Sequence, residues 1–152
     1  MESISRNNRK CFYGSSYDRG LEHVLKIWPE VKKAVPDATL EIAYGWDLFD
    51  KFYHDNPSSM QWKKRMLEMI KYDGITEHGR LSQDKVAELM KQCGLWAYPT
   101  HFGEISCITA MKCQYLGVIP VVVNVVTVGG TIAGVANGSV SPYILPSVGV
   151  TA

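Results

Sequence analysis

The sequence predicts an α/β fold, an open parallel sheet of the Rossmann-like type with helices on both faces. Short apolar runs alternate along the chain with longer segments in which apolar residues recur at helical spacing. The connections between these segments are short, which favours strands that lie side by side in one sheet. The strand runs are almost continuously apolar, as expected when helices cover both faces of a parallel sheet.

The first predicted strand covers residues 10–14 and ends at a glycine. A polar loop follows, and the next apolar residues recur at the spacing of a helix. Pro29 has no backbone N–H, so we expect the helix to break there. A second helical piece then runs to Val35, because Pro36 disfavours helical backbone in the residue before it. The apolar face of the first piece consists of Leu21, Val24, Leu25 and Trp28.

Four further strands are predicted where β-branched, aromatic or apolar runs are bounded by turn residues. These strands are residues 39–44, 75–78, 95–98 and 119–123. Segments of helical spacing lie between them, at residues 46–53, 58–72, from 82 onward, and 105–116. Ser58 or Ser59 is the expected N-cap of the second of these helices, and Ser82 that of the third.

Composition bounds the functions that the chain can have. Its 152 residues suffice for one domain with its own core. The 16 basic and 15 acidic residues are scattered, which argues against a broad nucleic-acid surface. Residues 118–128, the longest uncharged apolar run, contain Pro120 and Asn124 and are too short to span a bilayer. The polar N-terminus shows no signal sequence, so we expect a cytoplasmic protein.

The four cysteines, Cys11, Cys93, Cys107 and Cys113, have no CxxC or zinc-type spacing. Each falls in or beside an apolar segment, which favours buried, reduced thiols over reactive ones and suits a cytosolic compartment.

Three regions follow from composition: a polar extension at residues 1–9, a domain at 10–124, and a final segment at 125–152. No charged residue occurs from Val121 to the end of the sequence. The final segment is either buried strand and loop or the truncated end of a longer domain. In the second case it exposes an apolar patch through which the chain can self-associate.

The turn after residues 95–98 is the most informative part of the sequence. Parallel sheets bind ligands at the carboxyl ends of their strands, against the N-termini of the helices that follow. Glu104 lies at such a junction, and the backbone N–H groups of the next four residues open the predicted helix. These residues are Ile105, Ser106, Cys107 and Ile108.

Three segments occur in an order and spacing that resemble a known family: YGSSYDRGL, HGRLSQDKVAELMKQCGLWAYPT and EISCITAMKCQYLGVIPVV. Over residues 10–124 the chain is similar to the C-terminal, donor-binding half of glycosyltransferases of the GT-B fold, in particular the retaining enzymes of family 4. The resemblance implies a domain that binds a nucleotide-diphosphate sugar and transfers a hexose to an acceptor.

The sequence departs from the family pattern at several points. Lys112 occupies the position of a second glutamate that usually contacts the ribose. In the phosphate loop, Ser15 stands where the family often has an arginine, whereas Arg19 matches the basic residue before the next glycine. No segment resembles the acceptor-binding domain, so we expect this sequence not to encode it. The resemblance therefore implies a donor-binding half whose acceptor side belongs to a separate domain or chain.

The resemblance assigns catalytic roles to Glu104 and Arg19. Glu104 would bind hydroxyl groups of the donor sugar, although it is equally well placed to cap the helix after it. Arg19 would stabilise the leaving phosphate, with Arg80 as a second candidate, and each has a solvated surface position as its alternative. The other expected binding residues are Gly14, Ser15, Ser16 and the four residues after Glu104. Ser15 and Ser16 would either contact phosphate or cap the first helix.

No metal and no cofactor are expected, since the four histidines lack HxH or HxxxH spacing and the nucleotide sugar is a substrate. A non-catalytic interaction module, derived from such a transferase, is the main alternative. Two features favour that alternative: the lysine at position 112 in place of a glutamate, and the expected absence of the acceptor-binding half. A dinucleotide oxidoreductase would need a glycine-rich turn that the sequence lacks.

Overall fold

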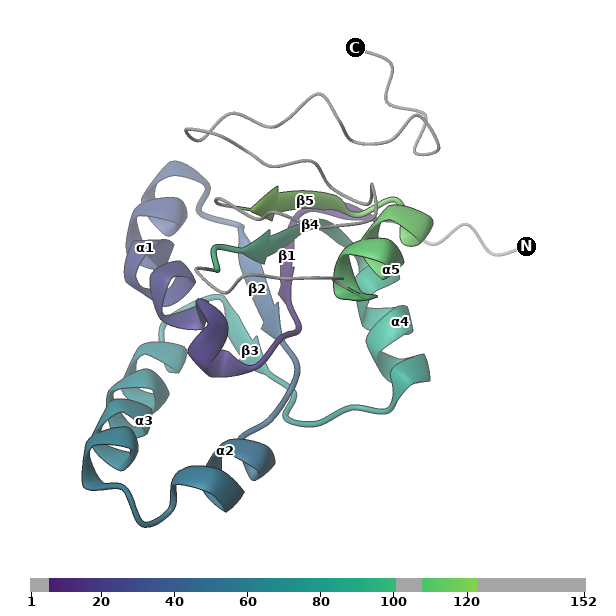
Figure 1. Ribbon diagram of the computed structural model, residues 1–152. Coiled ribbons are helices and arrows are strands. Elements are labelled where there is room, and N and C mark those ends of the chain that lie inside the picture. Colours follow the sequence, from purple (N-terminus) through teal and green to yellow (C-terminus); the bar gives the residue numbers. More distant parts are fainter. Residues whose placement is uncertain (1–5, 101–107, 123–152) are drawn as a thin grey trace.

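The computed structural model describes residues 6–100 and 108–122, which form an open, five-stranded, fully parallel sheet (Figure 1). The strand order is β3-β2-β1-β4-β5, and helices connect the strands, so the predicted fold class is confirmed. The strands are β1 (Asn7–Tyr13), β2 (Thr39–Ile42), β3 (Ile75–Glu77), β4 (Cys93–Tyr98) and β5 (Ile119–Val122). The helices are α1 (Leu21–Ala34), α2 (Asp47–Tyr53), α3 (Pro57–Ile70), α4 (Gln83–Gln92) and α5 (Ile108–Leu116), with a 3₁₀ turn at Tyr17–Arg19.

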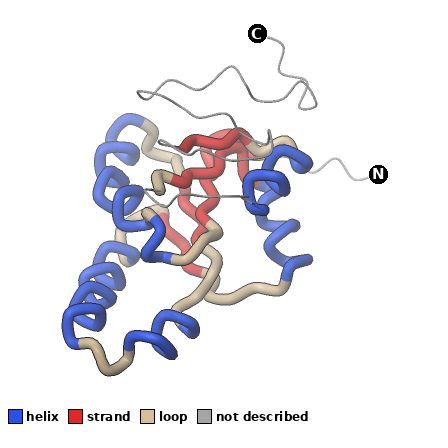
Figure 2. Tube along the Cα trace, in the orientation of Figure 1, coloured by secondary structure: helices blue, strands red, loops and turns tan. Residues whose placement is uncertain are grey.

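The helices form a layer on each side of the sheet (Figure 2). α1 packs against α3 on one side, and α4 packs against α5 on the other. This arrangement follows from the strand order. The chain moves in one direction along the sheet from β1 to β3 and in the other direction from β3 to β5. Because crossovers are right-handed, the helices of the two halves lie on opposite faces. The expected segment 125–152 and residues 1–5 of the expected N-terminal extension lie outside the described residues.

The central strands begin earlier than the sequence predicts. β1 starts at Asn7 instead of residue 10, and β4 starts at Cys93 instead of residue 95. Asn7 and Cys93 are register partners, so each strand extends the other at this end of the sheet. Polar residues such as Asn7 gave no strand signal by themselves. Pairing between strands, which a local pattern does not show, set this boundary.

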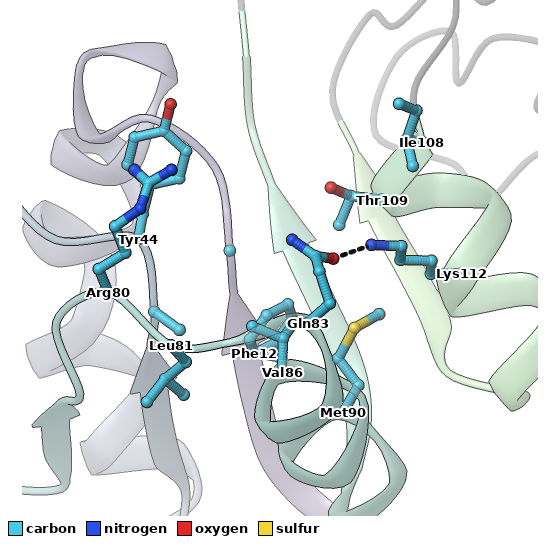
Figure 3. Close-up of a pocket in the computed structure, with 12 residues that line it drawn as sticks. Phe12, Tyr44, Arg80, Leu81, Gln83, Val86, Met90, Ile108, Thr109 and Lys112 are labelled. Atoms are coloured by element: carbon cyan, nitrogen blue, oxygen red, sulfur yellow. Dashed lines mark hydrogen bonds between the residues drawn. The ribbon is translucent and has the colours of Figure 1, made fainter. Parts of the chain in front are cut away.

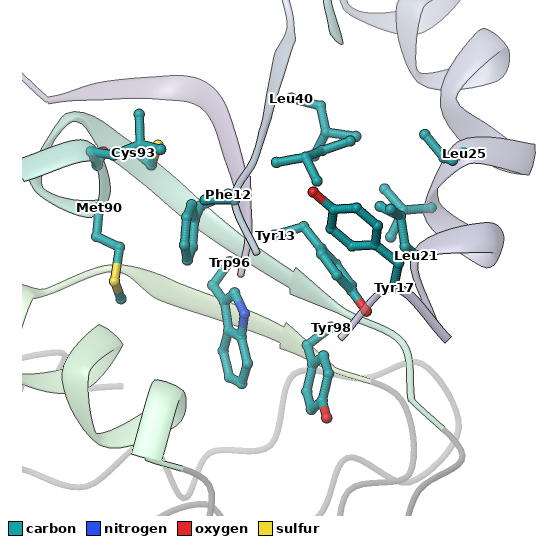
Figure 4. Close-up of a cluster of buried hydrophobic side chains, with 14 of the residues drawn as sticks. Phe12, Tyr13, Tyr17, Leu21, Leu25, Leu40, Met90, Cys93, Trp96 and Tyr98 are labelled. Carbon is teal, nitrogen blue, oxygen red and sulfur yellow. The ribbon is translucent and has the colours of Figure 1, made fainter. Parts of the chain in front are cut away.

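Large aromatic side chains fill the core near β1 and β4 (Figure 4). Phe12 of β1 and Trp96 of β4 are register partners, and neither is exposed to solvent. Trp96 stacks on Tyr98, with ring centroids 5.0 Å apart. Tyr13 of β1 is also fully buried. Burial of such side chains contributes about 1.5–3 kcal/mol each, so they stabilise the two central strands.

The helix break expected at Pro29 is wrong. α1 continues from Leu21 to Ala34 with Pro29 inside it. Proline removes only one backbone hydrogen bond, the one to the carbonyl of Leu25. The buried face of α1 holds the helix on both sides of that gap. The helix ends at Ala34, one residue before the predicted end, and Val35 leaves the helical conformation before Pro36. The buried residues of α1 are Leu21, Val24, Leu25 and Trp28.

The N-cap of α3 is Asn56, not Ser58 or Ser59 as predicted. The side chain of Asn56 accepts a hydrogen bond of 3.0 Å from the backbone N–H of Ser59. Pro57 follows as the first helical residue, which is a favoured position for proline. The pair Asn56-Pro57 therefore indicates the start of α3 better than either serine does. Ser82 does occupy the N-cap position of α4, although its side chain makes no capping hydrogen bond.

None of the helices in residues 6–100 and 108–122 has both the length and the apolar character needed to cross a bilayer. Three of the cysteines lie in this part of the chain, and all three are free thiols, as expected. Cys93 and Cys113 are buried, and Cys11 is half-buried. Cys107 lies outside the described residues.

Burial raises the pKa of the Cys93 thiol from about 9 to about 12, with a further increase from the nearby carboxylate of Glu41. In the unfolded chain the thiol loses its proton near its ordinary pKa. Between these two pKa values the folded state binds more protons, so the free energy of unfolding is expected to fall as pH rises above about 9, by up to about 1.4 kcal/mol per pH unit. Urea unfolding at pH 8 and pH 10 measures how much the free energy of unfolding falls with pH. In the Cys93→Ala variant this fall should be smaller. An equal slope in that variant would contradict the assignment.

Candidate functional site

The strand order reverses between β1 and β4, at the centre of the sheet. The chain leaves β1 toward β2 and β3 and later returns to form β4 on the other side of β1. In open α/β sheets, ligands bind at the carboxyl ends of the two strands at such a switch point. The loop from Gly14 to Gly20 leaves β1 at this place, and Pro99 and Thr100 leave β4 beside it.

Gly20 brings the two strand ends together. Its backbone has φ +116°, and a Cβ atom at this position would lie 2.3 Å from the carbonyl oxygen of Pro99. Only glycine allows both this backbone conformation and this close approach. Thr100, the next residue after Pro99, is 1% exposed. The loop that carries Arg19 is therefore pressed against the end of β4.

Ser16, in this loop, makes hydrogen bonds to residues near it in the sequence. Ser16 Oγ donates to Asp18 Oδ1 at 2.5 Å, and the carbonyl oxygen of Ser16 accepts from the Tyr13 hydroxyl at 2.8 Å. Ser16 precedes the 3₁₀ turn, and its side chain makes no capping hydrogen bond to the backbone. The N-cap of α1 is Gly20, so the expectation that Ser15 or Ser16 caps the first helix is wrong. Arg19, half-buried, ends the turn, with its backbone N–H donating to Ser16 O at 3.0 Å.

A cavity of about 430 Å³ opens beside this loop (Figure 3). The cavity lies on the face of the sheet that α4 and α5 cover, and the ends of β1 and β2 form its floor. Its size suits a nucleotide, because pockets for ligands of that size typically enclose about 300–1,000 Å³. The lining residues are Phe12, Gly14, Ala43, Tyr44, Arg80, Leu81, Gln83, Val86, Met90, Ile108, Thr109 and Lys112.

Two cations reach the cavity from opposite sides (Figure 3). The Arg80 guanidinium lies 6.0 Å from the centre of the Tyr44 ring, and its N–H groups make no hydrogen bond or ion pair with any described residue. Lys112 of α5 donates to the side-chain oxygen of Gln83 at the start of α4. None of the described residues that line the cavity is acidic. The cavity therefore favours an anionic ligand.

The loop that carries Arg80 is fastened to the end of β2. The backbone N–H of His78 donates to Ile42 O at 2.8 Å, and that of Tyr44 donates to Gly79 O at 3.0 Å. The imidazole Nε2 of His78 lies 2.6 Å from the carboxylate of Glu41. Three independent contacts thus fix the residues just before Arg80 and so position its side chain over the Tyr44 ring at the cavity.

The structure brings together three of the residues predicted from the sequence: Gly14, Arg80 and Ile108 all line this cavity. Ser15, Ser16 and Arg19 lie in the adjoining loop but are not among the lining residues. Glu104, Ile105, Ser106 and Cys107 lie outside the described residues, so their roles stay predictions.

Sequence reasoning missed several lining residues. Lys112 was noted only as a departure from a family pattern, yet it lies one helical turn after Ile108 and faces the same cavity. Tyr44 lies two residues after the end of β2, and Gln83 is the first residue of α4. Their positions after a strand and at the start of a helix were the signals available in the sequence. Thr109 offered no signal of its own. Within residues 6–100 and 108–122, no group of His, Cys, Asp and Glu side chains is arranged to hold a metal ion.

No protein-family model matches the sequence, and no curated protein matches it either. Several solved structures, including the following two, are similar in fold. A GtfA/B complex matches with a TM-score of 0.60 and 13% identity, over 94% of this chain and 28% of that one. The pneumococcal O-GlcNAc transferase GtfA, in complex with UDP and GlcNAc, matches with a TM-score of 0.59 and 13% identity, over 97% of this chain and 29% of that one.

This likeness shows that the chain shares its fold with part of glycosyltransferase structures. The chain spans less than a third of the length of either neighbour.

Proposed function

We propose that this chain is the nucleotide-sugar-binding domain of a glycosyltransferase and that the cavity beside Gly14 holds the donor. More specifically, we propose the C-terminal half of a GT-B enzyme of the family 4 type. The observation that carries the proposal is the position of the cavity, at the carboxyl ends of the strands next to the switch point, with two cations and no described acid in its lining. The fold shared with a UDP-bound transferase supports it.

A nucleotide sugar presents two phosphate groups whose charge the protein must balance. Arg80 can bind a phosphate through two parallel N–H donors, and Lys112 can act as a point charge on the other side. The hydroxyl of Thr109 adds a neutral donor within the same cavity. When the bond between sugar and phosphate breaks, negative charge builds on the leaving diphosphate. Cations at that position stabilise the transition state more than the bound substrate.

Glu104 and Arg19 complete the proposed site. Glu104 would accept hydrogen bonds from the donor sugar, because it follows β4, the strand on the other side of the switch point. Arg19 would approach the diphosphate from the β1 loop. Residues for the acceptor are proposed to come largely from a further domain or chain, so we expect this chain alone to bind donor and to catalyse little transfer.

Calorimetry with UDP, GDP and ADP tests this proposal. At least one of the three diphosphates is expected to bind, while uridine, guanosine and adenosine bind much more weakly because they offer no charge to the cations. Raising the salt concentration should weaken the binding. If none of the three diphosphates binds, the proposal is wrong.

Two variants separate the proposed roles. Arg19→Ala should weaken the binding of the diphosphate itself. Glu104→Ala should leave the diphosphate unchanged and weaken only the binding of a nucleotide sugar. Lys71→Ala is the matched control, since the Lys71 side chain is exposed and pairs with Glu68 on α3.

A further inference from the structure

A second cavity, of about 390 Å³, lies between α2 and α3. One residue of the β1 loop, Asp18, reaches it as well. The remaining lining residues come from the two helices. They are Phe49, Tyr53, Ser58, Ser59, Trp62 and Arg65. No expectation from the sequence included any of these positions in a site.

Helical spacing builds the walls of this cavity. Phe49 and Tyr53 are four residues apart on α2, so they lie on one face, with ring centroids 4.9 Å apart. Ser58, Trp62 and Arg65 share one face of α3 in the same way. The rings of Phe49 and Trp62 meet across the two helices at 5.2 Å. An aromatic wall of three rings results, and Tyr53 is still 40% exposed.

Residues that do not line the cavity hold the aromatic wall in place. The indole N–H of Trp62 donates to Glu22 Oε2 of α1 at 2.7 Å. Trp46 packs edge-on against both Phe49 and Trp62, at 5.4 Å and 5.9 Å. Lys63, which lies 5.2 Å from the Trp46 ring, bonds to Asp50 of α2 at 2.6 Å and so ties the two helices together. The cavity is therefore formed before any ligand binds.

The polar residues of the cavity define which ligand fits. Asp18 offers a carboxylate, Arg65 offers a guanidinium, and two serines offer hydroxyl groups. An anion would be repelled by Asp18, a cation would be repelled by Arg65, and a purely apolar ligand would make no hydrogen bond with any of the four groups. A neutral ligand with an apolar face and many hydroxyl groups satisfies every one of them.

We propose that this second cavity binds a neutral sugar ring, with its C–H face on the aromatic wall and its hydroxyls on Asp18, Arg65 and the serines. The β1 loop links the two cavities, because Gly14 lines the first and Asp18 lines the second. On the strength of this connection we assign the sugar to the acceptor. This last assignment rests on the proposed function, whereas the binding of a sugar does not.

Titration of the full chain with glucose, N-acetylglucosamine, maltose and N,N′-diacetylchitobiose tests the site, followed by tryptophan fluorescence, since Trp62 is in the wall, and by calorimetry. At least one of these sugars is expected to saturate. Tyr53→Ala and Arg65→Ala should each weaken its binding about tenfold. Tyr53→Phe, which retains the ring, should bind within about threefold of the parent chain.

Phe52→Ala and Lys64→Ala are the matched controls. Each affects an exposed neighbour on the same helix that does not line the cavity, and each should bind as the parent does. Absence of saturation by all four sugars, or equal losses in the control variants, would overturn the proposal. UDP, GDP and ADP titrated in parallel keep the two proposals apart: sugar binding without nucleotide binding supports this site and refutes the donor site, and the reverse result refutes this one.

Discussion

Replacement of both Arg80 and Lys112 by alanine is expected to weaken the binding of a nucleoside diphosphate by at least about a hundredfold. A hydrogen bond to a charged group contributes about 1.5–3 kcal/mol, which corresponds to about tenfold or more in affinity for each cation. Both side chains lie at the cavity surface, so neither replacement removes core packing. Calorimetry with the diphosphate that binds best measures the single and double variants.

The two single variants reveal how the diphosphate lies in the cavity. If Arg80 and Lys112 contact different phosphate groups, their effects on the binding free energy should add, since they approach from opposite sides. Arg9→Ala is the control for a lost arginine, because Arg9 is exposed and pairs with Asp37. Lys71→Ala is the corresponding control for a lost lysine. A double variant that binds as well as these controls would show that the cavity is not the diphosphate site.

The fold could be predicted from the sequence because its signals are local and repeated. Five apolar runs and the helical spacing between them specify a parallel sheet without knowledge of any tertiary contact. The errors occurred where packing overrides a local signal. Pro29 should end a helix, but burial of Trp28 and its neighbours holds both turns of α1 on the sheet. The start of β1 at Asn7 depends on its partner Cys93.

The first cavity could be predicted only in part. Gly14 and Arg80 follow the ends of parallel strands, and the topology alone brings such positions to one edge of the sheet. Lys112 faces the same cavity because of how α5 is rotated against α4, where it meets Gln83. No spacing within α5 predicts that rotation.

The second cavity could not be predicted from the sequence. Phe49 and Trp62 come from two helices joined by a short turn, and the angle at that turn decides whether the rings meet. Their helices were predicted correctly, but the surface between them depends on tertiary structure.

Replacement of Gly20 by alanine is expected to lower the free energy of unfolding by about 3–4 kcal/mol. About 1–2 kcal/mol of this loss comes from forcing a residue with a Cβ atom into a left-handed conformation. The rest comes from the clash with Pro99, whose carbonyl oxygen would lie 2.3 Å from the new atom, so that backbone and not a flexible side chain must move. Urea or thermal unfolding of the variant measures the loss, which should lower the melting temperature by roughly 10 °C for a chain of this length.

Gly79→Ala is the matched control for this experiment. Gly79 also has a positive φ, +65°, but a Cβ atom there would meet nothing within 4 Å. Its replacement should therefore cost only about 1 kcal/mol, the conformational part of the penalty. The difference between the two variants isolates the close approach of the β1 loop to the end of β4. Equal losses would mean that this approach contributes little, and that the loop carrying Arg19 is not held at the switch point by Gly20.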